Sequence, residues 1–264
     1  MTFADVTKRF RTRAQGFYVA VRDLTFEVAR GEFCAIVGPT GSGKSTTLNL
    51  IAGLERPSRG QVVVLGEVVT DGARGVGYMF QTDAIFPWKT VLQNVCTGPL
   101  YRGVPRHVAQ RQAHEWISRV GLAGFEDRYP NQLSGGMRKR VALAQTLINE
   151  PAVLLMDEPF ASLDVQTRTL MENELLELWS GSSASVVFVT HDLEEAIALA
   201  DRVLVFTAAP ATVKQSYRIA LPRPRNVAEV RFDPRFTQLY ERIWEDLRDE
   251  AVIAYERSLK AIRS

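Results

Sequence analysis

The chain has 264 residues, 46% of them hydrophobic, and 32 Lys+Arg nearly balance 30 Asp+Glu, so its net charge of +2 gives no support to an electrostatically driven nucleic-acid binder. Two cysteines, Cys34 and Cys96, exclude a disulfide scaffold and indicate a reducing compartment. Because the N-terminal segment carries charges where a signal peptide is apolar, and no apolar run approaches about 20 residues, we expect a soluble cytoplasmic protein.

Short strands dominate the predicted structure of the first quarter of the chain. Apolar and polar residues alternate over 24–29, and the apolar run 33–37 is typical of a strand buried on both faces. A helix is predicted after the glycines that follow, with Gly53 at its C-terminal end. Residues 62–69 predict a hairpin around Gly66-Glu67. A glycine-rich loop therefore lies between a buried strand and a helix.

Helices and strands alternate in the middle of the chain. Residues 90–133 are helical in pattern, and one helix there ends at Gly121 with a stripe typical of core packing: Val108, Trp116, Ile117 and Val120. Another helix runs from 137 to just before Pro151. Strands are predicted at 152–156, 186–189 and 203–206, with a helical stretch between the first two. This alternation predicts an α/β fold with a mostly parallel sheet.

The C-terminal part begins with a proline-rich stretch, 221–225, which predicts an extended linker. Beyond it, an amphipathic helix is predicted from the spacing of Phe236, Tyr240, Ile243 and Leu247. Because this stripe needs a surface to cover it, we expect the residues from about 235 onward to pack on the rest of the chain or on a partner subunit. A stabilising cap and a regulatory element are both compatible with the pattern.

A phosphate-binding loop is predicted from the pattern GxxxxGK[ST], which the chain matches at Gly38, Pro39, Thr40, Gly41, Ser42, Gly43, Lys44 and Ser45. The glycines let successive backbone N–H groups face a phosphate, and the following helix adds its dipole. Lys44 can reach the β- and γ-phosphates of a nucleotide, and the Ser45 hydroxyl can ligate Mg²⁺. Thr46 continues this nucleotide-contacting segment.

Two adjacent acids follow the apolar run that ends at Met156. A buried strand would deliver Asp157 to the carboxyl edge of the sheet, where its carboxylate can hold Mg²⁺ through water. Glu158 follows at the strand end and can orient or deprotonate an attacking water. Together with the phosphate-binding loop, this pair predicts nucleotide hydrolysis.

A third motif, LSGG, places Ser134, Gly135 and Gly136 at the start of the helix that precedes Asp157. With it, residues 1 to about 225 resemble the nucleotide-binding subunit of ABC transporters. The resemblance implies a P-loop NTPase (RecA-like) α/β domain with an antiparallel β subdomain. It also implies a helical subdomain inserted at about 90–135, and residues 226–264 then form a C-terminal helical extension.

Further site residues are implied by this resemblance. Gln81 matches the Q-loop glutamine that contacts Mg²⁺, Asp164 the D-loop aspartate, and His191 the switch histidine, which precedes a capping box formed by Asp192 and Glu195. Phe10 stands where the family usually has an aromatic residue that stacks on adenine, with Phe17 and Tyr18 as alternatives.

The chain is most similar to the nitrate/sulfonate/taurine type of importer ATPase. This similarity rests on four segments: Phe80–Trp88, Tyr129–Gln132, Met156–Phe160 and Leu221–Arg225. Two positions depart from the family pattern, since Gln145 stands where Arg is common and Lys139 where Gln is frequent. Neither position contacts a phosphate in the family pattern.

The resemblance also implies the mechanism and the partners. Each monomer holds an incomplete site for Mg-ATP, and Ser134 and Gly136 of a second copy close over the γ-phosphate. Gln81 links this site to the helical subdomain, whose surface near Phe86 and Trp88 would dock a membrane permease; core packing is the alternative for this aromatic pair. A solute-binding protein would act indirectly, and the subunit would lie at the cytoplasmic face of the membrane.

Other ABC-type ATPases are the competing interpretations. Repair ATPases insert long coiled coils, but no sustained heptad lies between Ser45 and Ser134. Translation ATPases carry two cassettes, and this chain has a single P-loop. The ATPase of a lipid-transport system is the closer alternative. We expect no nucleic-acid partner, and the transported solute is not encoded in these motifs.

Overall fold

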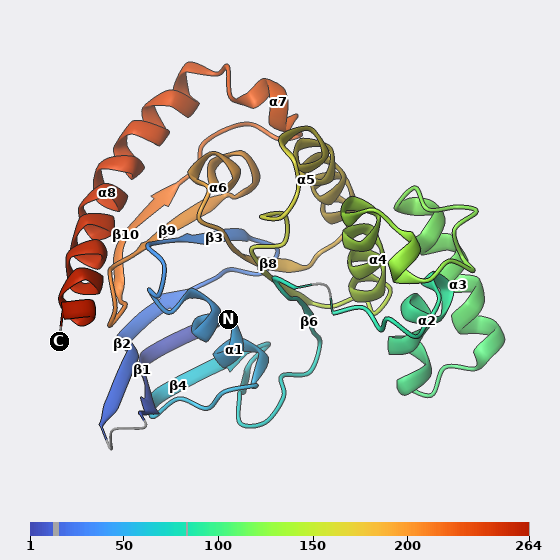
Figure 1. Cartoon of the computed structure of the whole chain (residues 1–264), viewed down its shortest axis with the longest axis horizontal. Helices are drawn as coiled ribbons and strands as arrows, with labels where there is room; N and C mark the ends of the chain where they lie inside the picture. The colour runs from blue at the N-terminus through green and yellow to red at the C-terminus, as the bar shows by residue number, and fades with distance from the viewer. Residues whose placement is uncertain (13–15, 83, 264) are drawn as a thin grey trace. The chain divides into compact units, whose positions relative to one another are not determined.

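The computed structural model describes residues 1–12, 16–82 and 84–263, which form two compact units. Unit 1 combines Met1–Arg74 with Ser183–Ser264, and unit 2 is Gly75–Ser182. The chain therefore leaves unit 1, completes unit 2 and returns. The elements are labelled in chain order in Figure 1.

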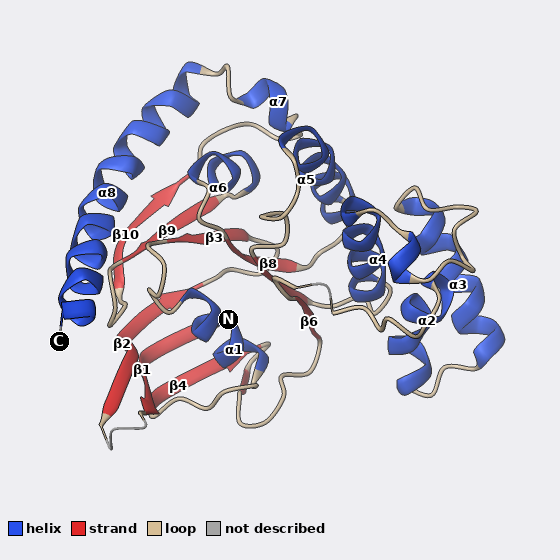
Figure 2. Cartoon of the chain, in the orientation of Figure 1, coloured by secondary structure: helices blue, strands red, loops and turns tan. Residues whose placement is uncertain are grey.

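Unit 1 contains an antiparallel sheet in the order β2-β1-β4-β5. Figure 2 labels three of these strands, β2, β1 and β4. Its strands are β1 (Thr2–Arg11), β2 (Phe17–Glu27), β4 (Arg59–Val64) and β5 (Glu67–Val68). The predicted hairpin is present, but its turn lies at Leu65-Gly66, one residue earlier than expected, where φ is 53° and 86°. Two successive residues with positive φ are the mark of a type I′ turn, whose twist matches that of the flanking strands.

A second group of strands in unit 1 has the order β10-β9-β3-β8. Strand β3 (Phe33–Val37) is fully buried and pairs in parallel with β8 (Ser185–Val189) and β9 (Arg202–Phe206). Strand β10 (Val213–Arg218) pairs antiparallel with β9. Helices α1 (Lys44–Ala52) and α6 (Leu193–Leu199) belong to the same unit, and Gly53 caps α1 with φ of 71°, as predicted. The predicted buried parallel strands are thus confirmed.

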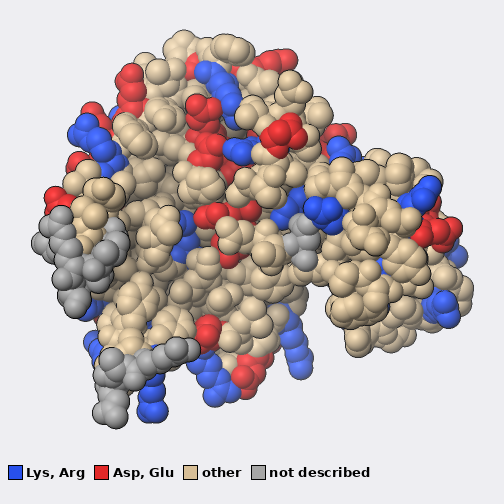
Figure 3. Space-filling view, viewed as in Figure 1, with Lys and Arg blue, Asp and Glu red and all other residues tan. Residues whose placement is uncertain are grey.

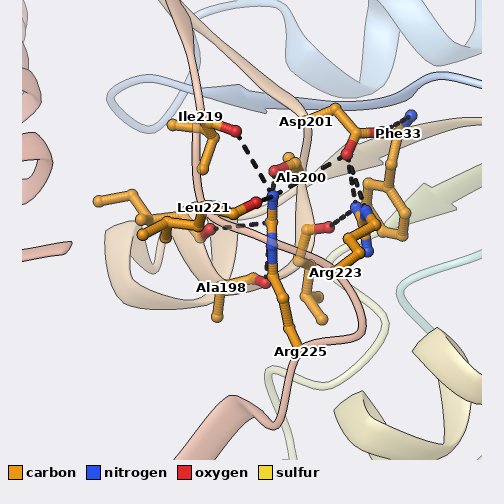
Figure 4. Close-up of polar contacts among 10 residues, drawn as sticks. Phe33, Ala198, Ala200, Asp201, Ile219, Leu221, Arg223 and Arg225 are labelled. Atoms are coloured by element: carbon orange, nitrogen blue, oxygen red, sulfur yellow. Dashed lines mark hydrogen bonds and ion pairs between the residues drawn. The ribbon is translucent and has the colours of Figure 1, made fainter. Parts of the chain in front are cut away.

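The proline-rich stretch 221–225 is anchored in unit 1, so the prediction of a plain extended linker is wrong. The guanidinium of Arg225, with its side chain only 1% exposed, donates hydrogen bonds to the carbonyls of Ala198, Ala200 and Leu221 at 2.7–3.2 Å (Figure 4). Asp201 adds an ion pair with Arg223 at 2.8 Å. The arginines satisfy the carbonyls at the end of α6, a role that composition alone does not reveal.

The C-terminal segment forms α7 (Val227–Val230) and the long helix α8 (Pro234–Arg263). Helix α8 contacts α6, β9 and β10 and runs along the strands of unit 1 (Figure 1). Phe236, Ile243 and Leu247 are buried as their spacing predicted, while Tyr240 is half-buried. The buried carboxylate of Glu250 accepts a hydrogen bond from the Ala208 N–H at 2.8 Å. The helix therefore packs on its own chain.

Unit 2 pairs β6 (Val76–Met79) in parallel with β7 (Val153–Asp157). Its helices are α2 (Val91–Tyr101), α3 (Arg106–Arg119), α4 (Gly135–Leu147) and α5 (Val165–Ser180), with a 3₁₀ turn, η1 (Pro130–Gln132). Helices α2, α3 and α4 contact one another. The predicted helical character of 90–133 is confirmed in outline.

The buried face of α3 differs slightly from the prediction. Ala109, Ala113 and Ile117 are fully buried, whereas Val108 and Trp116 are half-buried. Small alanines let neighbouring helices approach closely, and the larger side chains then lie at the rim of the contact. Ile117 and Val120 are buried as predicted, whereas the burial of Ala109 and Ala113 was not predicted.

Among the described residues, no helix combines the length and the apolar character needed to cross a membrane. On the face shown in Figure 3, described basic and acidic side chains are interspersed, which matches the near-neutral charge of the whole chain. The expected boundary after residue 225 remains a prediction. In the structure, α8 belongs to unit 1 together with the residues that precede 75.

Candidate functional site

The P-loop of unit 1 lies between β3 and α1, as predicted. Gly41 and Gly43 have φ of 78° and 77°, a conformation that L side chains rarely adopt. A Cβ on Gly43 would lie 2.8 Å from Val21 Cγ1 and 3.0 Å from Ala20 O. Glycine is thus required here both by the backbone conformation and by the close approach of β2.

Two polar side chains of this loop, Lys44 and Ser42, are placed where they could bind a phosphate. The buried Lys44 ammonium donates to the carbonyls of Gly38 and Pro39 at 2.8 and 3.0 Å. The Ser42 hydroxyl is buried and has no hydrogen-bond partner within the described part of the chain. A buried, unpartnered hydroxyl is uncommon, and a bound phosphate oxygen would satisfy it. The loop therefore fits the phosphates of a nucleotide, with Ser45 and Thr46 in the first turn of α1.

Three aromatic residues of β1 and β2 were candidates for adenine stacking. Phe10 and Tyr18 are paired across the two strands. Phe10 is half-buried beneath the Lys8 ammonium, 4.9 Å from its ring centroid, whereas Phe17 is 63% exposed. The Tyr18 phenol donates a hydrogen bond to the Gly41 carbonyl at 3.2 Å. Tyr18 thus contacts the P-loop directly, a relation that spacing alone did not favour over Phe10.

His191 follows β8 in unit 1 and is exposed. The Asp192 carboxylate caps α6 by accepting from the N–H groups of Glu194 and Glu195 at 2.9 and 3.3 Å. The predicted capping box is correct for the Asp192 side chain. In the other half of such a box the Asp192 N–H would donate to the Glu195 side chain, but here it donates to the Thr190 hydroxyl at 3.0 Å. The hydrogen bonds of Asp192 and Thr190 therefore fix the main chain on either side of His191, just before α6.

The acidic pair of unit 2 lies at the end of β7, where the sequence predicted it. Asp157 is 8% exposed. Burial of the Tyr78 phenol, and after it the negative charge of Asp157, raise the pKa of that phenol. Glu158 follows with φ of 44°, an unusual conformation for a residue with a side chain, which costs about 1 kcal/mol or more. The Gln81 amide donates to the Glu158 carboxylate at 3.1 Å. The structure therefore brings together Gln81 and Glu158, which the sequence predicted to belong to one site.

The LSGG motif lies at the start of α4. Ser134 is its N-cap and accepts from the Met137 N–H at 3.3 Å. A Cβ on Gly136 would lie 2.9 Å from the Thr167 methyl group, so glycine permits this close packing. Asp164 caps α5 by accepting from the Thr167 N–H at 3.0 Å, and this hydrogen bond lowers the pKa of Asp164. The structure thus gives Asp164 a capping role besides the one implied by the resemblance.

The contact that Lys139 makes was not predicted from the sequence. It is 2% exposed, and its ammonium donates to the main-chain carbonyl of Gln81 at 2.9 Å. In the sequence, Lys139 lies one helical turn before the apolar Leu143, and this spacing could have predicted that the lysine is on the buried face of the helix. That spacing does not show which group the ammonium reaches.

The aromatic segment near residue 88 is ordered by Asn94 of α2. The Asn94 side chain is fully buried. Its Oδ1 accepts a hydrogen bond from the Phe86 N–H at 2.7 Å. Its Nδ2 donates to the carbonyls of Phe86, Lys89 and Thr90. Trp88 is 69% exposed, and its ring centroid lies 5.5 Å from that of Phe86. The alternative prediction that Trp88 packs in the core is therefore wrong. Asp83, which belongs to the same motif, lies outside the described residues.

A groove of about 520 Å³ lies within unit 2 beside this segment. Its lining includes four aromatic side chains from β6, the following loop and α2, namely Tyr78, Phe80, Phe86 and Tyr101. Tyr101 is 84% exposed. An exposed aromatic side chain such as Tyr101 beside a concave surface is typical of a protein-binding site.

Comparisons with known proteins show the family to which this chain belongs. The sequence model described as "ABC transporter" matches residues 21–161. An uncharacterized ABC transporter ATP-binding protein of Methanocaldococcus jannaschii is 44% identical over 88% of this chain and 86% of its own. The nitrate import ATP-binding protein NrtD of a Synechocystis strain is 40% identical over 89% and 90%. The aliphatic sulfonates import ATP-binding protein SsuB of Bacillus cereus is 36% identical over 84% and 87%.

A solved structure extends the comparison. It is a dimeric ATP-binding cassette in a post-hydrolysis state with ADP and Pi, with a TM-score of 0.73 and 29% identity. The similarity covers 84% of this chain and 99% of that one.

Proposed function

This chain belongs to the ABC transporter family as an ATP-binding subunit with ATPase activity, and we propose that it powers an importer of a small anion resembling nitrate, a sulfonate or taurine. The observation that supports ATP as the substrate is the P-loop with its buried Lys44 and its unpartnered Ser42 hydroxyl. The importer type is supported by NrtD and SsuB, which are similar over most of both chains.

The phosphate-binding residues act through charge and hydrogen bonding. The Lys44 ammonium, now bonded to two loop carbonyls, can turn to the β- and γ-phosphates while the N–H groups of residues 41–46 donate to phosphate oxygens. The Ser42 hydroxyl gains the partner that it lacks. Tyr18, braced against Gly41, is the aromatic residue best placed to cover an adenine bound beside the loop.

Residues suited to Mg²⁺ are Ser45, Asp157 and Gln81, all with oxygen atoms of the kind that this ion prefers. The ion, when bound, would neutralise charge on the phosphates. Glu158 can accept the proton of the attacking water, and Gln81 orients its carboxylate. His191, held at the start of α6, would contact the γ-phosphate.

We propose that two copies of the chain cooperate in hydrolysis. The capped N-terminus of α4, with Ser134, Gly135 and Gly136, would stabilise the γ-phosphate bound by the other copy. Asp164 would contribute from the start of α5. The dimeric state of the solved cassette with ADP and Pi supports this arrangement.

A membrane permease is the proposed partner for unit 2. Trp88 is exposed on a segment held by Asn94, and the aromatic groove lies nearby in the same unit. Docking there would keep the subunit at the cytoplasmic face of the membrane, with a solute-binding protein acting indirectly. A lipid-transport ATPase is the alternative, and copurification with a solute-binding protein would distinguish the two.

The decisive test of the ATPase site compares Glu158→Gln with Lys44→Ala in the full-length chain. Glu158→Gln keeps the shape of the side chain but removes its basicity, so ATP should still bind while turnover falls about 10²–10⁴-fold. This variant should elute as a dimer in size-exclusion chromatography with Mg-ATP. Lys44→Ala should lose most ATP affinity and remain monomeric. Parental turnover in either variant would refute the assigned roles, and a slow Glu158→Gln that never dimerises would refute the shared site.

A further inference from the structure

A buried cation in unit 2 contacts the proposed catalytic groups through the main chain. Lys139 lies in α4, is 2% exposed and donates from Nζ to the Gln81 carbonyl at 2.9 Å. The Gln81 side-chain amide in turn donates to the Glu158 carboxylate at 3.1 Å. Three segments far apart in the sequence, namely α4, the loop after β6 and the end of β7, are thus connected in series.

The first contact holds the loop firmly. A hydrogen bond from a charged donor is shorter than one from a neutral donor and roughly twice as strong. Burial also reduces competition from water for the acceptor. Because the carbonyl and the side chain of Gln81 belong to the same residue, fixing the carbonyl restricts where the amide can reach. Gln81 itself is exposed, so its own packing constrains it little.

Helix α4 connects this contact to the LSGG motif. Lys139 is five residues after the N-cap Ser134, about 7.5 Å along a helix axis. Ser134 caps the continuous helix of 13 residues that contains Lys139, and the helical hydrogen bonds keep the distance between the two residues nearly constant. Any shift of the Ser134 end, such as engagement of a nucleotide on a second copy, would therefore carry the Lys139 ammonium and the Gln81 carbonyl with it.

We propose that Lys139 is a positioning residue that couples the signature helix α4 to the catalytic carboxylate of Glu158 through Gln81. The inference rests on the proposed function, because it concerns the orientation of the proposed general base. The neighbouring cations of α4 have other tasks. Arg138 donates to the Leu133 carbonyl at 2.9 Å, and Arg140 to the Val120 carbonyl at 2.7 Å.

A double-mutant cycle with Gln81 tests the coupling. Lys139→Met keeps most of the side-chain volume without the charge, and it should lower kcat about tenfold with the ATP KM within about twofold. In a Gln81→Ala background no amide remains to be positioned, so the same substitution should change kcat by less than about twofold. A purely structural role for Lys139 would lower kcat equally in both backgrounds and would overturn the proposal.

Hydrogen–deuterium exchange of the ligand-free chain gives a readout independent of turnover. The amides of residues 80–82 should exchange faster in Lys139→Met than in the parent. Arg140→Met is the matched control, since it removes an adjacent cation that binds elsewhere, and it should leave exchange at 80–82 unchanged. Unchanged exchange in Lys139→Met would contradict the holding role.

A substitute variant and a pair of controls complete these experiments. If Lys139→Met does not fold, Lys139→Gln replaces it in both experiments, because the glutamine side chain is uncharged and too short to reach the Gln81 carbonyl. Failure of the proposed function is recognised separately, as parental turnover in Lys44→Ala and Glu158→Gln. With those variants inactive, a kcat loss that is the same in both backgrounds counts against Lys139 alone.

Discussion

The Tyr18 phenol donates a hydrogen bond to the Gly41 carbonyl at 3.2 Å, which links β2 to the P-loop. Gly41 has a positive φ and belongs to the turn whose N–H groups would face a phosphate. A ring attached to this turn has a fixed position relative to the nucleotide phosphates. Phe10, its partner across the strands, instead lies against the Lys8 ammonium.

Adenine affinity should therefore depend on Tyr18 more than on Phe10. Tyr18→Ala should raise the ATP Kd roughly tenfold, because stacking of a base on an aromatic side chain is worth about 1–3 kcal/mol. Tyr18→Phe keeps the ring and should bind nearly as the parent does. Titration calorimetry with the Phe10→Ala and Phe17→Ala variants as controls would check this. A larger loss in Phe10→Ala than in Tyr18→Ala would return the stacking role to Phe10.

Trp88→Ala should separate partner binding from folding. Since Trp88 is 69% exposed, its truncation should leave the Tm and ATP binding close to parental values. Loss of an aromatic anchor at an interface costs about 2 kcal/mol or more, so affinity for the permease should fall roughly 30-fold. Phe125→Ala, at another exposed aromatic residue of unit 2, is the matched control. Parental permease affinity in Trp88→Ala would remove Trp88 from the interface.

Arg225→Met should destabilise unit 1 strongly. The substitution leaves the buried carbonyls of Ala198, Ala200 and Leu221 without this donor, at a cost of about 3 kcal/mol, or a Tm lower by roughly 6–12 °C. Arg223→Met, at a less buried guanidinium, should cost less.

The effect of Arg225→Met should be independent of pH near neutrality. Burial lowers the pKa of Arg225 to about 10, so the group is charged at pH 6–8 in both the folded and the unfolded chain. Because the unfolded chain binds more protons only above about pH 10, linkage adds no slope at neutral pH. Thermal melts at pH 6, 7 and 8 should show the same Tm deficit, and a deficit that changes with pH would contradict this account.

Helix α8 should behave as a stabilising cap of unit 1. Leu247→Ala removes a buried contact with the unit and should cost about 3 kcal/mol, while the folded protein keeps the parental kcat. Trp244→Ala, on the exposed side of α8, should change neither. Thermal melts and steady-state ATPase assays on both variants check this. A changed kcat in Trp244→Ala at parental Tm would instead establish a regulatory role.

Local patterns were sufficient to predict the elements that hold the proposed site residues. The P-loop, the acidic pair at residues 157–158 and the LSGG helix start depend on glycine conformations, strand burial and helix capping, which act over a few neighbouring residues. For the same reason the buried strands β3, β7 and β8 and the end of α1 at Gly53 lie within one or two residues of the prediction.

Only the tertiary structure decided which distant groups these side chains meet. Arg225 was predicted to lie in a linker, yet it binds carbonyls at the end of α6, and Lys139 reaches the main chain of Gln81, 58 residues away. Tyr18 was one of three aromatic candidates until its phenol was seen at Gly41. A cation or hydroxyl can satisfy any nearby acceptor, so sequence fixes its capacity to bond, while chain packing selects the partner.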